Sequence, residues 1–191
     1  MEIEETVELA GRSLTLLRPP SADELIDEAA FAVDDFLPYW AELWPSGVAL
    51  AAHVGRRDLR GRRVLELGAG LGLPSLAAAL RGADVLATDW AEDAVALLQA
   101  NAARNGVALR VEVARWDDPA RFGSGWDLVL AADVLYEARN ADQLLALLPR
   151  LEAREIVLAE PGRPFAKDFL AHFDVEEIGE RLYRLRCSPS S

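Results

Sequence analysis

The sequence predicts a doubly wound, mostly parallel β-sheet that carries helices on both faces and one antiparallel strand near its C-terminal end. Three observations predict it. From residue 62 onward, short apolar segments alternate with helical segments. The apolar segments are hydrophobic throughout, as strands covered on both faces are. Two alternating runs around Gly179 end the chain as a hairpin, which supplies the antiparallel strand.

The first 60 residues lack this rhythm and are expected to form an accessory layer on the sheet. Residues 7–19 alternate around Gly11 and predict a small hairpin. Ser21 and Glu24 form a capping box for a helix that ends before Pro38. One face of that helix carries Leu25, Ile26, Ala29 and Val33.

The core elements then follow in chain order. Pro74 lies in the first turn of one helix and Gly82 just past its end. Gly106 caps the end of the next helix, and Asn140 and Gln143 cap the start of a third. Strands are expected at 62–68, 83–89, 109–115, 126–133, 155–160, 174–179 and 181–187, and helices at 73–82, 90–106, 140–148 and 164–173. We predict a single domain over 1–191, with its core at 61–191.

Composition excludes several classes of function. The chain has 191 residues and a net charge of −12, so its mean field repels nucleic acid and suits a basic partner or a small molecule. No apolar run is long enough for a membrane span, and the acidic N-terminus is not a signal peptide. The single cysteine, Cys187, suits the cytoplasm. The two histidines lie far apart with no cysteine near either, so no metal site is predicted.

The segment 64–72, VLELGAGLG, joins the first core strand to its helix. Gly68, Gly70 and Gly72 let the backbone turn tightly and approach a ligand at the helix N-terminus. A dinucleotide fingerprint would place its third glycine where Leu73 stands. The carboxylate of Glu66 suits a cationic ligand better than a pyrophosphate. The alternative is a plain strand-to-helix turn.

Asp89 ends the second core strand, seventeen residues after Gly72. A carboxylate at this position accepts hydrogen bonds from ribose hydroxyls. The alternative is that Asp89 is the N-cap of the next helix, with Glu92 completing a capping box. Both roles can hold together.

The sequence resembles class I S-adenosylmethionine-dependent methyltransferases of the Rossmann-like, seven-stranded fold. The E-x-G-x-G-x-G, the acid after the next strand and the terminal hairpin carry this resemblance. Within the class it is similar to the family-16 type, which includes the lysine methyltransferases of the electron-transfer flavoprotein β subunit. The matching segments are YWAELWPSG, VLELGAGLGLPSLAAA, ATDW, NAARNG, DLVLAADVLYE and EPGRPF, between residues 39 and 165.

The resemblance implies a role for each matching residue. The methionine end of S-adenosylmethionine would contact Glu66, Gly68 and Gly70, its ribose Asp89, and its adenine Trp90 and Trp116. Each tryptophan could instead belong to the core. The remaining residues expected at the cofactor are Gly72, Ala132 and Trp44. Asp133 and Tyr136 would lie beside the reacting methyl group, unless Asp133 merely caps a helix.

The aromatic segment 38–47, PYWAELWPSG, is expected to close over the cofactor. Trp44 would cover the sulfonium, because an aromatic face suits a cation. Tyr39 and Trp40 would line the acceptor channel, although Trp40 could be a hydrophobic plug. The acceptor implied by the resemblance is a protein lysine. The alternatives are a small-molecule amine and a cofactor-binding module without catalysis.

Overall fold

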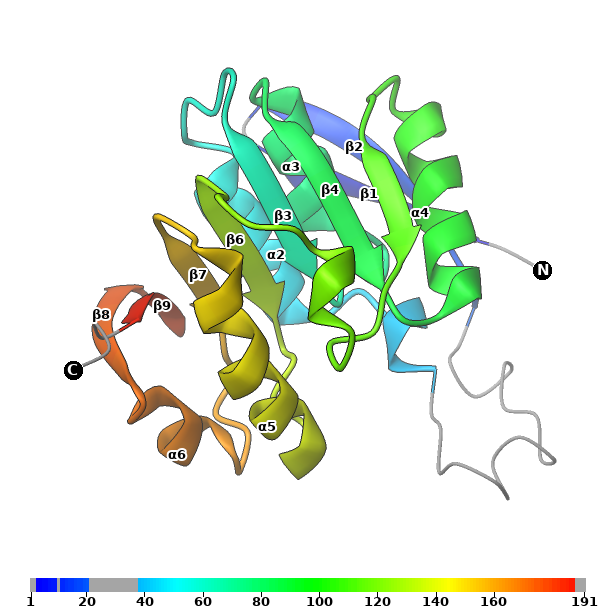
Figure 1. The fold of residues 1–191 in the computed structure, drawn as a ribbon. Helices are drawn as coiled ribbons and strands as arrows, with labels where there is room; N and C mark the ends of the chain where they lie inside the picture. Colours follow the sequence, from blue (N-terminus) through cyan, green and yellow to red (C-terminus); the bar gives the residue numbers. More distant parts are fainter. Residues whose placement is uncertain (1–2, 10, 21–37, 188–191) are drawn as a thin grey trace, which may run out of the picture.

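The computed structural model describes residues 3–9, 11–20 and 38–187. Within them, a seven-stranded sheet has the order β5-β4-β3-β6-β7-β9-β8 (Figure 1). Its strands are β3 (Arg63–Leu67), β4 (Asp84–Asp89), β5 (Arg110–Val113), β6 (Leu128–Ala132), β7 (Ile156–Ala159), β8 (Phe173–Gly179) and β9 (Leu182–Cys187). The helices are α2 (Pro45–Val54), α3 (Leu73–Leu80), α4 (Glu92–Arg104), α5 (Ala138–Leu147) and α6 (Ala166–Leu170), with short 3₁₀ turns η2 (Tyr39–Ala41), η3 (Pro119–Arg121) and η4 (Leu148–Leu151).

The direction of the strands confirms the predicted fold class. Strands β5, β4, β3, β6 and β7 pair in parallel. Strand β9 lies between β7 and β8 and is antiparallel to both. The hairpin at the end of the chain therefore places one antiparallel strand inside the sheet. Because β3, β4 and β6 are parallel neighbours, their carboxyl ends meet at one edge, which is where ligands bind in such sheets.

Successive residues of the central strands β3, β4, β6 and β7 face two separate cores. Val64 and Leu65 are both fully buried, yet Val64 packs with α2 and α3, whereas Leu65 packs with α5 and η4. Figure 1 shows α2 and α3 behind the sheet and α5 in front of it. This double coverage explains why the strands read as continuous apolar runs.

The predicted N-terminal hairpin is present and packs against α4. It consists of β1 (Ile3–Leu9) and β2 (Arg12–Arg18) in antiparallel register. The side chains of Asn101 on α4 and of Asn105, its C-cap, accept hydrogen bonds from the backbone N–H groups of Leu17 and Thr15 and donate to their carbonyls. Two asparagine amides thus satisfy the free edge of β2 as a further strand would.

Three predictions on helix starts have different outcomes. The helix expected between Ser21 and Pro38 lies outside the described residues. Helix α5 begins at Ala138, so Asn140 and Gln143 are not its caps; the Asn140 amide donates instead to the Val134 carbonyl, 3.1 Å away. The capping box at the start of α4 was also wrong, because Ala91 is the N-cap and no side chain caps it.

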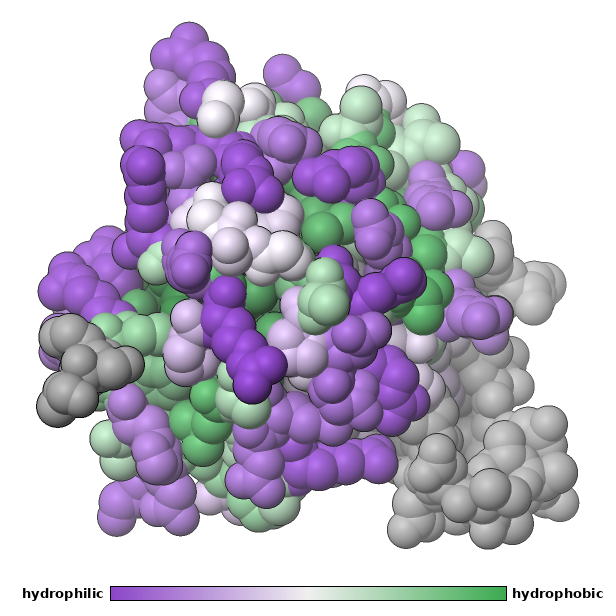
Figure 2. Space-filling view, in the orientation of Figure 1, coloured by the Kyte–Doolittle hydropathy of each residue, from purple (hydrophilic) through white to green (hydrophobic). Residues whose placement is uncertain are grey.

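Within the described residues, no helix is long and apolar enough to cross a membrane. The same residues contain no group of three or more His, Cys, Asp or Glu side chains that could hold a metal ion. Figure 2 shows that hydrophilic residues dominate the face that carries α5.

Candidate functional site

A cavity of about 260 Å³ lies at the carboxyl ends of β3, β4 and β6. Every residue for which the sequence predicted a site role lines it. These residues are Tyr39, Trp40, Trp44, Glu66, Gly68, Gly70, Gly72, Asp89, Trp90, Trp116, Ala132, Asp133 and Tyr136. Side chains from positions 39 to 136 thus converge on one space, which a plain strand-to-helix turn does not explain.

Two glycines of the loop after β3 are required by close neighbours. Gly70 has a φ of 51°, and a Cβ there would lie 3.1 Å from the backbone carbonyl oxygen of Trp40. Gly72 has a φ of 76°, and a Cβ there would lie 2.3 Å from a methyl carbon of Leu98 on α4. The loop therefore presents bare backbone to the cavity while the aromatic segment and α4 both approach it closely.

Asp89 joins the end of β4 to the glycine loop. Its carboxylate accepts hydrogen bonds from the backbone N–H of Gly70 at 2.9 Å and of Ala91 at 3.0 Å. The side chain is buried, and this burial raises the pKa of Asp89 while the backbone hydrogen bonds oppose the shift. Because Ala91 is the N-cap of α4, a capping role does not account for Asp89.

Glu66 is a buried carboxyl group in the middle of the sheet. It is 1% exposed and accepts a hydrogen bond from the Ser75 hydroxyl on α3. Burial raises its pKa to about 8. A cation that entered the cavity would stabilise the ionised form, so this group is suited to a positively charged ligand.

The aromatic segment contributes Tyr39, Trp40 and Trp44 to the lining of the cavity. The indole N–H of Trp44, the residue before α2, donates to the Tyr39 carbonyl at 2.7 Å. The Tyr39 ring lies 5.1 Å from that of Tyr136 and 6.2 Å from that of Trp44. Three aromatic rings thus form a connected wall, and the 37% exposure of Tyr39 shows that this wall reaches the surface.

The two tryptophans expected near adenine differ in burial. Trp90 is 37% exposed and lines the cavity, so it is not a core residue. Trp116 is partly buried, packs against the core on the α5 face and also lines the cavity.

Asp133 follows β6 and has a positive φ of 55°, which is rare for a residue other than glycine. Both its carboxylate oxygens accept hydrogen bonds from the Arg163 guanidinium, at 2.6 and 2.9 Å. Asp133 does not cap α5, because the N-cap of α5 is Glu137. The backbone outlier and the ion pair of a buried carboxylate together mark this position as specialised.

Arg163 was absent from the sequence-based set of site residues. It lines the cavity, and its guanidinium carbon lies 5.7 Å from the Trp44 ring centroid. The backbone N–H groups of Gly162 and Arg163 donate to the buried Glu160 carboxylate at 2.7 and 2.6 Å. The EPGRPF segment contained the signal: an arginine just past a strand that ends at this edge.

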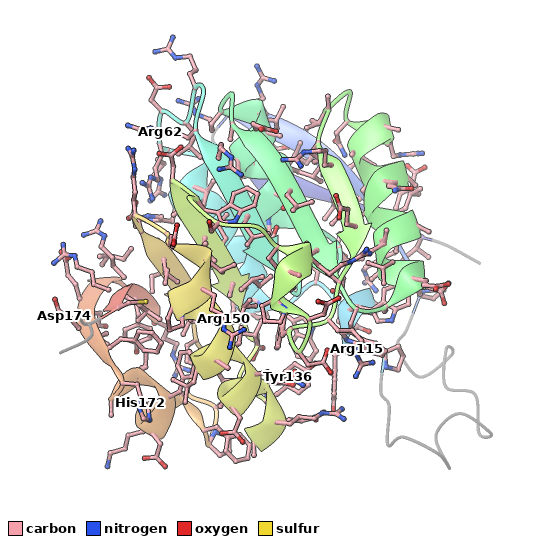
Figure 3. The ribbon with its side chains drawn as sticks, viewed as in Figure 1. Arg62, Arg115, Tyr136, Arg150, His172 and Asp174 are labelled. Atoms are coloured by element: carbon pink, nitrogen blue, oxygen red, sulfur yellow. The ribbon has the colours of Figure 1, made fainter. Side chains whose placement is uncertain are left out.

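Trp126, at the other edge of the sheet, is a core residue. Its indole N–H donates to the Phe122 carbonyl at 3.0 Å, and the ring is 2% exposed. His53 is partly buried on α2, away from the cavity lining. Figure 3 shows Arg62 and Tyr136 at opposite ends of the sheet.

The chain is similar to lysine methyltransferases. A family model described as "Lysine methyltransferase" matches residues 39–173. The electron transfer flavoprotein beta subunit lysine methyltransferase of Danio rerio is 33% identical over 169 residues, with 79% of this chain and 64% of that protein covered. Protein N-lysine methyltransferase METTL21A of Danio rerio is 33% identical over 154 residues, with 72% of this chain and 70% of that protein covered. The chain thus spans less than two thirds of the first relative.

Solved structures share the fold. The T. thermophilus 16S rRNA methyltransferase RsmC superposes with a TM-score of 0.68 at 17% identity, covering 97% of this chain and 50% of that one. The ribosomal protein L11 methylase of Lactobacillus delbrueckii subsp. bulgaricus gives 0.59 at 23% identity, covering 75% and 78%.

Proposed function

This chain belongs to the lysine methyltransferase family, and from that premise we propose that it transfers a methyl group from S-adenosylmethionine to a lysine side chain of a protein. One observation carries the proposal. The glycine loop, the two buried carboxyls Glu66 and Asp89, and the aromatic segment all line a single cavity at the carboxyl edge of the sheet.

The cavity fits this cofactor. Gly68 and Gly70 leave room that a Cβ would fill, since a Cβ at Gly68 would lie 3.2 Å from Val134. Glu66 would accept a hydrogen bond from the ammonium of the methionine end, and Asp89 would accept hydrogen bonds from the ribose hydroxyls. Trp90 and Trp116 would lie along the adenine. Gly72 and Ala132 complete the lining.

When bound, S-adenosylmethionine supplies a methyl group already activated on a sulfonium. The protein's contribution is then to align the acceptor and to exclude water. Tyr39, Trp40 and Tyr136 would line the acceptor channel and remove water from the acceptor amine. Desolvation lowers the pKa of a lysine amine from about 10.4, which favours the neutral form that can attack. Asp133 orients that amine by accepting a hydrogen bond.

The shape of the mouth favours a protein acceptor over an enclosed metabolite. Tyr39 and Trp90 are each 37% exposed, so the cavity opens to the surface where a side chain could enter. The net charge of −12 favours a basic acceptor. The same charge disfavours nucleic acid, and the single cysteine leads us to propose the cytoplasm.

The test is label transfer. Purified protein and S-adenosylmethionine labelled on its methyl group are incubated with the electron transfer flavoprotein β subunit, with ribosomal protein L11 and with cell lysate. We expect label on a lysine of a protein band, and a rate that falls as salt rises because charge steering is screened.

The other outcomes identify the two alternatives. Label confined to the small-molecule fraction, with no salt dependence, points to a small-molecule N-methyltransferase. Tight cofactor binding with no label on any acceptor points to a binding module without catalysis.

A further inference from the structure

The ion pair between Asp133 and Arg163 lies in the part of the cavity where the acceptor amine is expected. The Asp133 side chain is 6% exposed and the Arg163 side chain 35%, so the carboxylate is covered while its partner reaches the solvent side. The Arg163 guanidinium also lies beside the Trp44 ring. The pair therefore stands between the aromatic segment and the end of β6.

Arg163 is held in this position from two sides. Its guanidinium makes the bidentate, two-pronged contact with the Asp133 carboxylate, in which two N–H groups donate to the two oxygens. Lysine cannot reproduce this geometry. Its backbone N–H donates to Glu160, which is 2% exposed. This double attachment fixes the guanidinium charge next to the carboxylate expected to orient the acceptor.

An unpaired carboxylate at this place would bind the wrong form of a lysine. It would attract the ammonium ion and stabilise its proton, and an ammonium has no lone pair with which to attack. A carboxylate already paired with a guanidinium offers no net charge to an ammonium. It still has lone pairs that can accept a hydrogen bond from a neutral amine.

We infer that Arg163 is a positioning residue that selects the neutral amine of the acceptor: it holds the Asp133 carboxylate in place and cancels its charge. The inference rests on the proposed function and adds to it the residue that sets the protonation state of the bound lysine.

Other ionisable groups contact Arg163 or line the same cavity. Glu160 follows β7, and burial raises the pKa of its carboxyl. Burial also raises the pKa of the Tyr136 hydroxyl. Glu137 forms an ion pair with Arg139 at 2.5 Å. The remaining ionisable groups that line the cavity are Tyr39, Glu42, Glu66 and Asp89.

The test compares pH profiles of single-turnover methylation at saturating S-adenosylmethionine, on whichever acceptor protein the label-transfer experiment identifies. Saturating cofactor removes the contribution of Glu66 to cofactor binding. The wild-type rate should rise with pH, and this rising limb of the profile reports the pKa of the bound lysine amine. In Arg163→Gln, the amine loses a positive neighbour and gains an uncompensated carboxylate, so its proton is held more tightly. The pKa that describes this rise in rate should increase by about one pH unit. At pH values below it the rate should be about tenfold lower than in the wild type, and at high pH the difference should disappear.

Two matched variants separate charge from structure. Arg163→Lys keeps the charge without the two-pronged contact, so its limb should stay near the wild-type position. Arg154→Gln removes the same charge at the far edge of the sheet, where Arg154 pairs with Asp127, and should leave the profile unchanged. Binding of S-adenosylhomocysteine to Arg163→Gln should stay within threefold of wild type, which shows that the cavity is intact.

The outcomes distinguish the two claims. A wild-type protein that labels no acceptor overturns the proposed function and this inference with it. A wild type that turns over, beside an Arg163→Gln variant that loses the same fraction of its rate at every pH or loses none, overturns the inference alone.

Discussion

An ion pair between arginine and aspartate lies at each of two edges of the sheet, the one formed by the carboxyl ends of the parallel strands and the one formed by their amino ends. The two ion pairs differ in how far they are exposed to water. At the carboxyl edge, one arginine meets one aspartate, and their side chains are 35% and 6% exposed. At the amino edge, the side chain of Asp127 is 19% exposed and is shared by Arg62 and Arg154, which are 53% and 77% exposed. The amino edge also has a cavity, so a cavity alone does not identify the site.

The difference lies in what surrounds the charges. The carboxyl edge combines aromatic rings and glycine backbone with buried carboxyls whose pKa values are raised. The cavity at the amino edge is lined mainly by arginines and by acids that pair with them, and several of these arginines are more than half exposed. Exposed pairs are screened and contribute between about 0 and 1 kcal/mol, whereas removing one partner of a buried pair costs several times more. Equivalent substitutions should thus have unequal effects at the two edges.

The largest contrast is expected between two glycines with positive φ. Gly70→Arg should abolish binding of S-adenosylmethionine, because the side chain would fill the ligand space and meet the Trp40 carbonyl. Gly61 has a φ of 68° and open space around it at the amino edge. Gly61→Arg should leave binding unchanged. Calorimetry on both variants, after circular dichroism has shown that they fold, measures the contrast; intact binding by a folded Gly70→Arg would refute the cofactor assignment.

Asp89→Ala should weaken cofactor binding by roughly 1.5–3 kcal/mol, the range for a hydrogen bond to a charged group. The same change removes the acceptor for the Gly70 and Ala91 N–H groups, so the melting temperature should fall as well. Calorimetry and thermal melts report the two effects separately. A lower melting temperature with unaltered affinity would make Asp89 a structural residue only.

The affinity for S-adenosylmethionine should depend on pH through Glu66. The pKa of this carboxyl is raised to about 8, so in the free protein it is protonated below that pH. Binding a ligand ammonium requires the ionised form. Cofactor binding should therefore release a proton, and affinity should fall about tenfold for each pH unit below the pKa.

Calorimetry between pH 6 and 8, in buffers of different ionisation enthalpy, measures that proton. Glu66→Gln should remove the dependence, and a flat profile in the wild type would contradict it. The raised pKa has a second consequence for the ligand-free protein. Its stability should decrease as pH rises from about 4.5 toward 8, because the unfolded chain ionises first.

Asp133→Ala should reduce methyl transfer at least tenfold, roughly 1.4 kcal/mol of transition-state stabilisation, with cofactor affinity changed by less than about 1 kcal/mol. The variant leaves the Arg163 charge without its partner beside the acceptor. Tyr136→Phe should also slow transfer, because Tyr136 lines the cavity together with Asp133. Single-turnover rates provide the measurement. A rate equal to wild type for Asp133→Ala would remove this residue from the reaction.

The smallest effect is expected at the amino edge. Asp127→Ala removes the partner of Arg62 and Arg154, which stay in water, and the acceptor for the Arg63 backbone N–H at 2.9 Å. It should lower the free energy of unfolding by about 1 kcal/mol. Methyl transfer should be unaffected. Urea denaturation together with the rate assay checks both. A loss of activity comparable to that of Asp133→Ala would abolish the distinction between the two edges.

Local chemistry made much of this molecule predictable from its sequence. The order of strands and helices follows from apolar runs and from helix boundaries such as Pro74 and Gly82, because periodicity and backbone constraints act over a few residues. The G-x-G-x-G loop, Asp89 and the aromatic segment could be located for the same reason. Parallel strands of known order bring such segments to one edge, and each of these residues lies at the cavity.

Contacts between distant segments could not be read from the sequence. Nothing local indicates that Arg163 reaches Asp133, thirty positions earlier, or that Asn101 and Asn105 complete the edge of β2. The true start of α5 was also missed, because Asn140 uses its amide on the Val134 carbonyl instead of capping. A polar side chain has several possible partners along the chain. The packing of the elements selects one, since a buried polar group must find its partner among whatever the fold brings within reach.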